Sequence, residues 1–397
     1  MDSKRVIKLA GDDCCTGCGS CKAKCPQGAI SFQEDEEGFP SPVIDNDICI
    51  RCGLCELSCP DLSLKLTNIV KGVYAAQLKD RVALLDSTSG GLFTAFSREA
   101  FRQGGVVYGC KWNEDCNAVF QKAETEVEIL PMRGSKYVWS WAGDAFPEIK
   151  TCLNEGRFVL FTGLPCQVAG LRRFLVKDYP NLICIEMFCG GAPSPMAMRA
   201  YFSTITRDIS FEQLNYKFRD KHKYGVGVNV SYQGKKKRIN QSWVGNSWYW
   251  SFYNKLFHRR SCFHCRYRYI NRVGDITIGD FWSVKKYHPE LDIKAGVSSV
   301  LINTDKGADF FRTVEDQLIV VQSKLEYVAD YQNLTITDEK VEFQMVPYRK
   351  ELFELLRKKG WTAVEHKDLY SPHRVILLLK STKLGSVARR LKKKTLG

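Results

Sequence analysis

The sequence predicts an α+β protein in which a small cysteine-rich N-terminal domain precedes a mixed α/β core. Nine of the 17 cysteines lie before residue 60. From about residue 70 onward, short apolar runs typical of strands alternate with apolar residues at helical spacing. The last segment, residues 372–397, has eight Lys or Arg residues and no Asp or Glu. We therefore expect three parts, at residues 1–68, 69–345 and 346–397.

Eight of the early cysteines form two runs with the spacing C-x2-C-x2-C-x3-C-P: Cys15, Cys18, Cys21 and Cys25, then Cys49, Cys52, Cys55 and Cys59. This spacing binds [4Fe–4S] clusters, and the fourth cysteine of each run serves the other cluster. The predicted ligand sets are Cys15, Cys18, Cys21 and Cys59 for one cluster, and Cys25, Cys49, Cys52 and Cys55 for the other. Zinc sites would lack the trailing Cys-Pro and are the weaker interpretation. Residues 1–68 resemble the bacterial two-cluster ferredoxins.

The remainder of the chain predicts alternating strands and helices. Apolar runs indicate strands at 73–78, 82–85, 106–110, 118–122, 157–162, 182–188 and 275–278. Helical spacing indicates helices at 92–103, 143–155, 167–175, 196–205 and 247–257. A strand-rich region at 211–240 is expected to contain a basic hairpin at 234–238. Neither common phosphate-binding glycine signature occurs, which disfavours a nucleotide site of the dinucleotide or P-loop type.

Four later cysteines suggest a third metal site. Cys166 and Cys189 each follow a predicted strand, and Cys262 and Cys265 form a C-x2-C pair. Because the carboxyl ends of consecutive strands meet at one sheet edge, the first two should lie close together, and the pair could close over them. A [4Fe–4S] cluster, a zinc site and unrelated buried thiols all remain open on spacing alone. Four other cysteines have no such companions and are assigned to core packing: Cys110, Cys116, Cys152 and Cys184.

Seven short motifs occur in order through the core: STSGG at 87–91, RGSKYV at 133–138, FTGLPCQ at 161–167, FCGGAPS at 188–194, FRDK at 218–221, the C-x2-C pair, and DITIGDFW at 275–282. From residue 87 to about 312 the chain therefore closely resembles the coenzyme F420 hydrogenase/dehydrogenase beta-subunit family. The resemblance implies one FAD per chain and a third [4Fe–4S] cluster held by Cys166, Cys189, Cys262 and Cys265. Gly-Leu-Pro-Cys here replaces the commoner Gly-Thr-Pro-Cys.

The same motifs supply the candidate cofactor-binding residues: Thr88, Ser89, Gly90, Gly91, Arg133, Ser135, Lys136, Tyr137, Gly163, Pro165 and Asp280. Small side chains at a helix start let a flavin edge or pyrophosphate approach the backbone. The basic loop offers positive charge to phosphates or flavin carbonyls. The alternatives are an ordinary helix cap at 88–91, a solvated basic loop at 133–136, and a turn at Asp280. No catalytic residue is assigned.

The leading hypothesis is a cytoplasmic iron–sulfur flavoprotein oxidoreductase. Electrons would pass between a one-electron carrier such as ferredoxin, the clusters and FAD. Hydride exchange at the flavin would serve a two-electron substrate, either F420 or another small molecule, for example in surface-polysaccharide metabolism. The alternative is an electron-transfer beta subunit of a larger hydrogenase- or dehydrogenase-type complex, without a substrate of its own.

Expectations about partners are less specific. The basic tail suggests contact with a membrane surface, or else a terminal helix packed on the core. A homo-oligomer is a further possibility. Nucleic acid is not an expected partner, because bound clusters would offset much of the formal charge of +14. The weakest hypothesis is a zinc protein that binds nucleic acid.

Overall fold

The computed structural model describes residues 6–63, 68–206, 217–221, 229–233, 238–242, 245–330 and 343–369. The basic tail at 372–397 lies outside these residues. So does most of the basic hairpin expected at 234–238, although the flanking strands β9 (Asn229–Gln233) and β10 (Arg238–Ser242) pair antiparallel. No helix in the described ranges has the length and apolar character needed to cross a membrane.

The two cysteine runs of the N-terminal domain fold in the same way. Each contains a short helix, α1 (Ser20–Lys24) or α2 (Leu54–Leu57), which begins directly after a C-x2-C pair. The preceding residues, Gly19 and Gly53, have φ of 84° and 77°, a left-handed conformation that favours glycine. Between the runs, β1 (Ile30–Glu34) and β2 (Pro40–Ile44) form an antiparallel hairpin, and α3 (Pro60–Ser63) follows the second run.

The core is built on a nine-stranded mixed sheet in the order β13-β3-β12-β11-β8-β7-β4-β5-β6. Its strands are β3 (Gly72–Leu78), β4 (Val106–Trp112), β5 (Ala118–Ala123), β6 (Ser140–Trp141), β7 (Val159–Gly163), β8 (Leu182–Met187), β11 (Ile276–Asp280), β12 (Ser298–Ile302) and β13 (Leu318–Gln322). The central strands β4, β7, β8 and β11 run parallel, whereas β3, β12 and β13 pair antiparallel. The mixed α/β core is therefore confirmed.

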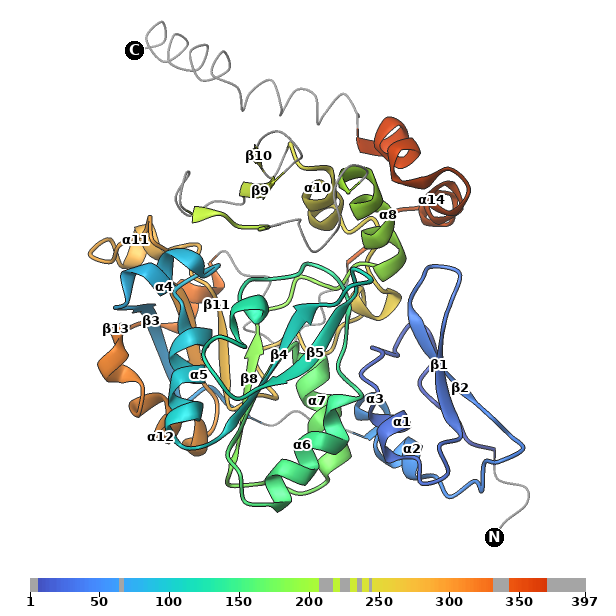
Figure 1. Cartoon of the computed structure of the whole chain (residues 1–397), viewed down its shortest axis with the longest axis horizontal. Coiled ribbons are helices and arrows are strands. Elements are labelled where there is room, and N and C mark those ends of the chain that lie inside the picture. Colours follow the sequence, from blue (N-terminus) through green and yellow to red (C-terminus); the bar gives the residue numbers. More distant parts are fainter. Residues whose placement is uncertain are drawn as a thin grey trace, which may run out of the picture.

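Helices cover both faces of this sheet (Figure 1). The helices are α4 (Arg81–Asp86), α5 (Leu92–Arg102), α6 (Ala145–Asn154), α7 (Pro165–Leu175), α8 (Pro195–Ile205), α10 (Ser247–Tyr253), α11 (Val284–Tyr287), α12 (Asp305–Arg312), α13 (Leu325–Ala329) and α14 (Arg349–Val364). Along β7, Leu160 packs with α5 and α12, whereas its neighbour Phe161 packs with α6 and α7. Adjacent strand residues thus bury opposite faces, as the period of two requires.

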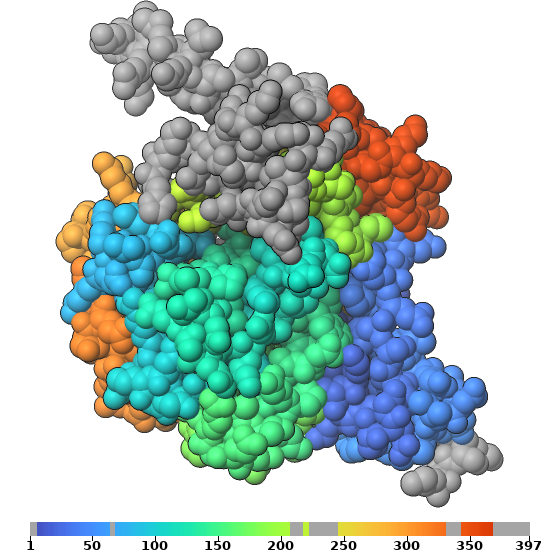
Figure 2. Space-filling model, in the orientation of Figure 1, coloured from blue at the N-terminus to red at the C-terminus, as the bar shows by residue number. Residues whose placement is uncertain are grey.

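A separate aromatic cluster joins α8, α10 and α14 at one end of the molecule. Tyr201, Trp248 and Trp361 are buried there, and the ring centroids of Trp248 and Trp361 lie 5.5 Å apart. The N-terminal domain lies beside α6 and α7, and Figure 2 shows it packed directly against the core along one flank. The contact region between domain and core therefore includes the helix that carries Cys166.

One predicted strand is wrong. Residues 82–85, expected as a strand, belong to helix α4. Asp80 caps this helix, because its carboxylate accepts hydrogen bonds from the backbone N–H groups of Val82 and Ala83, both at 3.1 Å. The helix expected to follow Cys166 begins at Pro165, so Cys166 lies within its first turn. The helix expected to reach residue 257 ends at Tyr253.

Candidate functional site

Four cysteines of the core surround one cavity at the carboxyl edge of the sheet. Cys166 follows β7, and Cys189 follows the adjacent parallel strand β8. Cys262 ends the short 3-10 helix η2 (Arg260–Cys262), and Cys265 lies in the loop after it. All four line a cavity whose empty volume is about 560 Å³, including its opening. The structure thus brings together the cysteines of the predicted third cluster, which we call the core site.

The core site combines four cysteine thiols with backbone N–H groups that donate to two of them. Within the described residues, no three His, Cys, Asp or Glu side chains converge closely enough to hold one metal ion. The four cysteines of the core site surround a cavity instead. Gly191 and Ala192 donate their backbone N–H groups to the Sγ atoms of Cys189 and Cys262, both at 3.4 Å. Such bonds would stabilise thiolates once a metal is bound.

The N-terminal cysteines also gather in the two predicted sets. Cys25, Cys49, Cys52 and Cys55 line a second cavity, which we call the outer site. The other set, which we call the inner site, is Cys15, Cys18, Cys21 and Cys59. Burial raises the pKa of Cys18 to about 12, and the nearby sulfurs of Cys15 and Cys59 add to the effect. The exchange of the fourth cysteine between runs is therefore present in the folded chain.

The inner site lies against the helix that begins at the core site. A methyl group on Gly170 of α7 would lie 2.8 Å from Cβ and 2.9 Å from Sγ of Cys18. Cys166 is one turn earlier on the same helix. Thr16 of the N-terminal domain lines the core cavity, and its carbonyl oxygen accepts a hydrogen bond from Trp139 Nε1 at 3.1 Å. The inner and core sites are thus neighbours across the domain contact.

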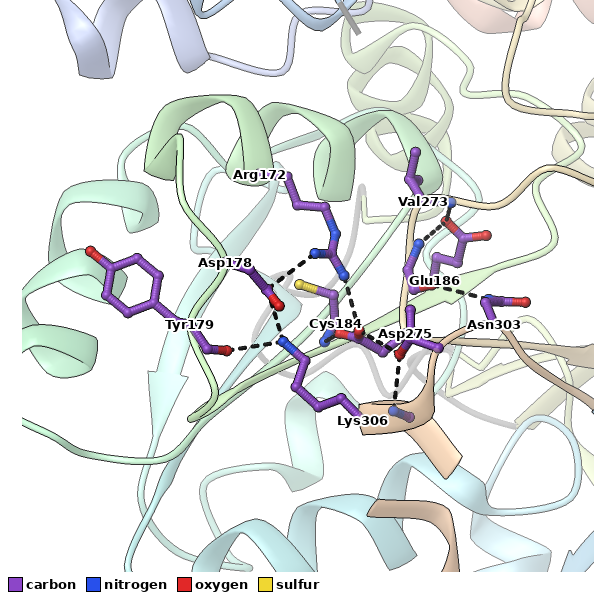
Figure 3. A network of polar contacts seen from close by, with 12 residues as sticks. Arg172, Asp178, Tyr179, Cys184, Glu186, Val273, Asp275, Asn303 and Lys306 are labelled. Carbon is purple, nitrogen blue, oxygen red and sulfur yellow. Dashed lines mark hydrogen bonds and ion pairs between the residues drawn. The ribbon is translucent and has the colours of Figure 1, made fainter. Parts of the chain in front are cut away.

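A buried polar network holds the loop that follows Cys265 (Figure 3). Glu186 of β8 accepts hydrogen bonds from the N–H groups of Val273 and Gly274 at 3.2 and 2.9 Å, and forms an ion pair with Arg272. Arg272 in turn donates to the carbonyl oxygens of Tyr267 and Tyr269. The guanidinium and the carboxylate are both nearly inaccessible to solvent, so removal of either would leave a buried charge without its partner.

The same network ties α7 to the sheet. Asp275 accepts a hydrogen bond from the backbone N–H of Cys184 at 2.8 Å and lies 3.1 Å from Arg172 Nη2 on α7 (Figure 3). The buried thiol of Cys184 lies outside all three cysteine sites, as does that of Cys152, in agreement with the packing roles predicted for them. The sequence alone did not reveal this network, because isolated acidic and basic residues carry no spacing signal.

The glycines of the first cofactor motif are required by packing. A methyl group on Gly90 would lie 2.3 Å from the carbonyl oxygen of Ala76 and 2.6 Å from the backbone nitrogen of Ser298. Gly91 has φ of +80° where it precedes α5, and a methyl group there would lie 2.9 Å from Leu78 Cβ. Both glycines therefore have structural reasons that do not involve a cofactor. Ser89 also contacts Ser298, through a 3.0 Å hydrogen bond between hydroxyls.

The basic loop at 133–136 contacts the STSGG motif, but the side chain of Lys136 points into its own loop. The N–H of Ser135 donates to Thr88 Oγ1 at 3.3 Å, so the two motifs lie side by side. Lys136 Nζ donates to four carbonyl oxygens of its own loop, those of residues 131–134, at 3.0–3.2 Å. Burial lowers the pKa of Lys136 to about 8. Its ammonium organises the loop, whereas the sequence suggested that it would face a cofactor.

Two arginines present buried donors near these motifs. Arg133 lies 3.6 Å from Glu126, but its Nε has no hydrogen-bond partner among the described residues. Arg219, which sequence reasoning placed in a motif but not in the site, pairs with Asp280 and lies over the ring of Trp282. Its Nε and Nη2 likewise lack partners in the described ranges. Buried guanidinium donors without acceptors favour an anionic or carbonyl-rich ligand.

The three remaining cofactor candidates are Tyr137, Gly163 and Pro165. Tyr137 adopts φ of 51°, which is uncommon for a bulky residue, and its ring packs against those of Phe218 and Phe252. Gly163 ends β7, and Pro165 lines the core cavity at the start of α7. Because β3 runs parallel to β11 through their shared neighbour β12, the carboxyl ends of β3, β7, β8 and β11 all meet at this edge.

Comparison with known proteins gives two family matches. Residues 156–326 match the family model for the C terminus of the coenzyme F420 hydrogenase/dehydrogenase beta subunit, and residues 14–61 match a 4Fe-4S dicluster domain. A chain of the F420-reducing [NiFe] hydrogenase complex from Methanosarcina barkeri is similar over 78% of this chain and 96% of its own length, with 16% identity and a TM-score of 0.47.

Two curated relatives are similar over most of the chain. Coenzyme F420-dependent sulfite reductase of Methanocaldococcus jannaschii is 25% identical over 317 residues, which are 78% of this chain and 47% of that protein. The F subunit of the F(420)H(2) dehydrogenase of Methanosarcina mazei is 22% identical over 341 residues, covering 80% and 87% of the two chains. This chain thus spans about half the length of the sulfite reductase. Residues 156–326 of this chain thus match the C-terminal part of the F420 hydrogenase/dehydrogenase beta-subunit family, and residues 14–61 form a 4Fe-4S dicluster domain.

Proposed function

We propose that the chain holds a third [4Fe–4S] cluster and one FAD in its core, and that it transfers electrons between a one-electron carrier and a two-electron substrate. The observation that carries this proposal is the series formed by the three cysteine sites. The outer site shares a small domain with the inner site, and the inner site adjoins the core site at Gly170. The core site in turn lies at the sheet edge where the cofactor motifs gather.

The core site fits a [4Fe–4S] cluster by the chemistry of its donors. Cys166, Cys189, Cys262 and Cys265 would be the ligands, and the cavity between them supplies the space. Two backbone N–H groups already point at Sγ atoms. The ion pair between Glu186 and Arg272 would hold the loop after Cys265 in place, so that the fourth ligand keeps its position.

FAD would bind at the same sheet edge, beside the adjoining STSGG and RGSKYV motifs. When bound, FAD exchanges electrons singly with clusters and in pairs with a substrate. Arg133 and Arg219 would bind its phosphates or ring carbonyls through the donors that lack partners among the described residues. Asp280 would fix the orientation of Arg219, and the carbonyl contacts of Lys136 would keep the loop of Arg133 in shape. Tyr137 would exclude water on the side facing the core site.

F420 is the leading candidate for the two-electron substrate, because both curated relatives are named for reactions with F420. The one-electron carrier would meet the chain at the outer site, where Cys52 is exposed. The exposed side chains of Ile48, Leu57 and Leu62 in the N-terminal domain favour a second candidate function. In that case the chain is an electron-transfer subunit that docks permanently on a catalytic partner.

The test is the cofactor content of protein purified without oxygen. We expect about 12 iron atoms, as many acid-labile sulfides and one FAD per chain. Cys166→Ser should lose about four iron atoms, whereas the matched variant Cys184→Ala, which alters a buried thiol outside all three sites, should lose none. About eight iron atoms without flavin in the wild type would overturn the proposal. Turnover of F420 with a viologen, compared with NAD(P)H, then separates a self-sufficient enzyme from a docked subunit.

A further inference from the structure

Arg259 contacts both the inner site and the core site. Its Nε donates to the carbonyl oxygen of Cys15 at 2.7 Å, and its Nη2 lies 3.8 Å from Cys15 Sγ. The same residue lines the core cavity, and its own carbonyl oxygen accepts a hydrogen bond from the N–H of Cys262 at 2.9 Å. A single residue therefore contacts Cys15 through its side chain and Cys262 through its backbone carbonyl.

The position of this guanidinium is fixed from several directions. Both Nη atoms donate to the carbonyl oxygen of Pro40 at 3.1 Å. The guanidinium carbon lies 5.3 Å from the ring centre of Phe39 and 5.9 Å from that of Trp139. The residue is 4% exposed. In the described part of the chain, every acceptor that it contacts is a carbonyl oxygen or a sulfur. Because no carboxylate pairs with it among the described residues, its positive charge is directed to the two cysteine sites.

Neighbouring arginines do not share this position. Arg268 lines the core cavity but stacks on Phe343, and none of its contacts in the described residues reaches the inner site. Arg272 is paired with Glu186. Arg260, the next residue in the chain, is half-exposed and pairs with Glu37. The chain thus offers three arginines for comparison. Arg259 lies between the inner and core sites, Arg268 lies at the core site alone, and Arg260 lies at neither site.

We propose that Arg259 sets the reduction potentials of the inner and core clusters together. Reduction adds one negative charge to a cluster, so a nearby buried cation stabilises the reduced form and raises the potential. When an electron passes between the two clusters, one is oxidised and the other reduced by one electron, and no proton or other reactant is required. Because the same cation favours the reduced form of both clusters, it raises both potentials in the same direction.

This inference rests on the proposed core cluster, and one experiment separates the two. The full chain, purified without oxygen, is titrated with dithionite and followed by low-temperature EPR. In Arg259→Gln, with iron content unchanged, we expect the inner and core potentials to fall and the outer potential to stay constant. In Arg268→Gln only the core potential should fall, and in Arg260→Gln none should change.

Three results would overturn the inference. The first is Arg259→Gln with full iron and unchanged inner and core potentials, and the second is a shift at only one of these clusters. Should the Gln variant lose iron, Arg259→Lys decides, since it keeps the charge but loses the forked contacts to Cys15. Because the positive charge is the proposed cause, the inner and core potentials of Arg259→Lys should stay close to those of wild type, and a fall of both potentials with full iron is the third overturning result. Wild-type protein with only about eight iron atoms would instead remove the core cluster itself.

Discussion

Gly170 of α7 and Cys18 of the inner site approach each other so closely that no side chain fits between them. A methyl group on Gly170 would lie 2.9 Å from Cys18 Sγ, closer than real Cβ contacts permit. The glycine is in the interior of an 11-residue helix, where alanine is normally the more stable residue. Contact with the N-terminal domain, rather than helix propensity, therefore explains the glycine.

Gly170→Ala should destabilise the protein, against the sign that helix propensity predicts. Propensity alone favours alanine by about 1 kcal/mol, but overpacking against Cys18 costs about 1–3 kcal/mol. We expect a lower melting temperature and partial loss of inner-site iron, measured by thermal unfolding and iron analysis. Gly11→Ala is the control, because a methyl group there meets nothing within 4 Å. A melting temperature equal to or above that of wild type would contradict the close contact.

Glu37→Gln should weaken the attachment of the N-terminal domain. Glu37 accepts hydrogen bonds from Arg349 of α14 at 2.9 and 2.6 Å, and both side chains are nearly buried. Removing one partner of such a pair costs about 3 kcal/mol. Thermal unfolding measures the loss. Glu36→Gln is the matched control, since Glu36 is 84% exposed and lies 3.8 Å from Arg357; a similar loss in both variants would show that the pair has no special weight.

The cost of Glu37→Gln should not vary with pH near neutrality. Burial tends to raise the pKa of Glu37, but the hydrogen bonds and charge of Arg349 outweigh burial and lower it. A lowered carboxyl pKa gives stability that is fully present above the unfolded value and is lost as the pH falls through the folded value. Between pH 6 and 9 the difference in melting temperature between the two proteins is therefore expected to be constant. A difference that shrinks within this range would contradict the assignment.

Two substitutions in one loop should separate flavin binding from loop structure. Arg133→Gln should lower the FAD content, because it removes a buried cation with an unused donor, but should leave the melting temperature of flavin-free protein nearly unchanged. Lys136→Met should lower that melting temperature, because four carbonyl oxygens lose their shared donor. Released flavin and thermal unfolding are measured for both. Equal flavin content in Arg133→Gln and wild type would remove Arg133 from the site.

The outer cluster should be the first to break down in air. Cys52 is exposed, whereas Cys18 and the four core-site cysteines are only partly exposed. During timed exposure to oxygen, samples reduced for EPR should lose the outer-site signal before the other two. Cys52→Ser should remove the same signal at the start. Loss of the core-site signal first would mean that its cavity is more accessible than the described residues indicate.

Spacing predicted the cysteine sites, because ligands of one cluster must lie close together and the chain length between them is limited. A topological rule places Cys166 and Cys189 together, since each follows one of two adjacent parallel strands. Spacing does not reveal the role of a residue with a long side chain, because that role depends on the atoms that the end of the side chain contacts in the folded protein. Lys136 and Arg259 are both basic residues beside recognisable motifs, yet one turns into its own loop and the other spans two sites.

The local pattern of apolar residues was also insufficient where a capping residue determines whether a segment forms a helix or a strand. Residues 82–85 read as a strand, but the carboxylate of Asp80 satisfies the first N–H groups of a helix instead. The strands β12 and β13 join the sheet through antiparallel pairing with distant strands, which no local signal specifies. The same applies to Arg219, whose pairing with Asp280 crosses 61 residues of chain.

The ion pair between Glu37 and Arg349 and the close contact between Gly170 and Cys18 attach the N-terminal domain to the core at two separate points. A domain held in this way does not act as a swinging arm that carries electrons by diffusion. Electron transfer inside the chain should then be insensitive to solvent viscosity, whereas the encounter with an external carrier should slow as glycerol is added. The kinetic bottleneck under dilute conditions would lie outside the protein, at the surface around Cys52.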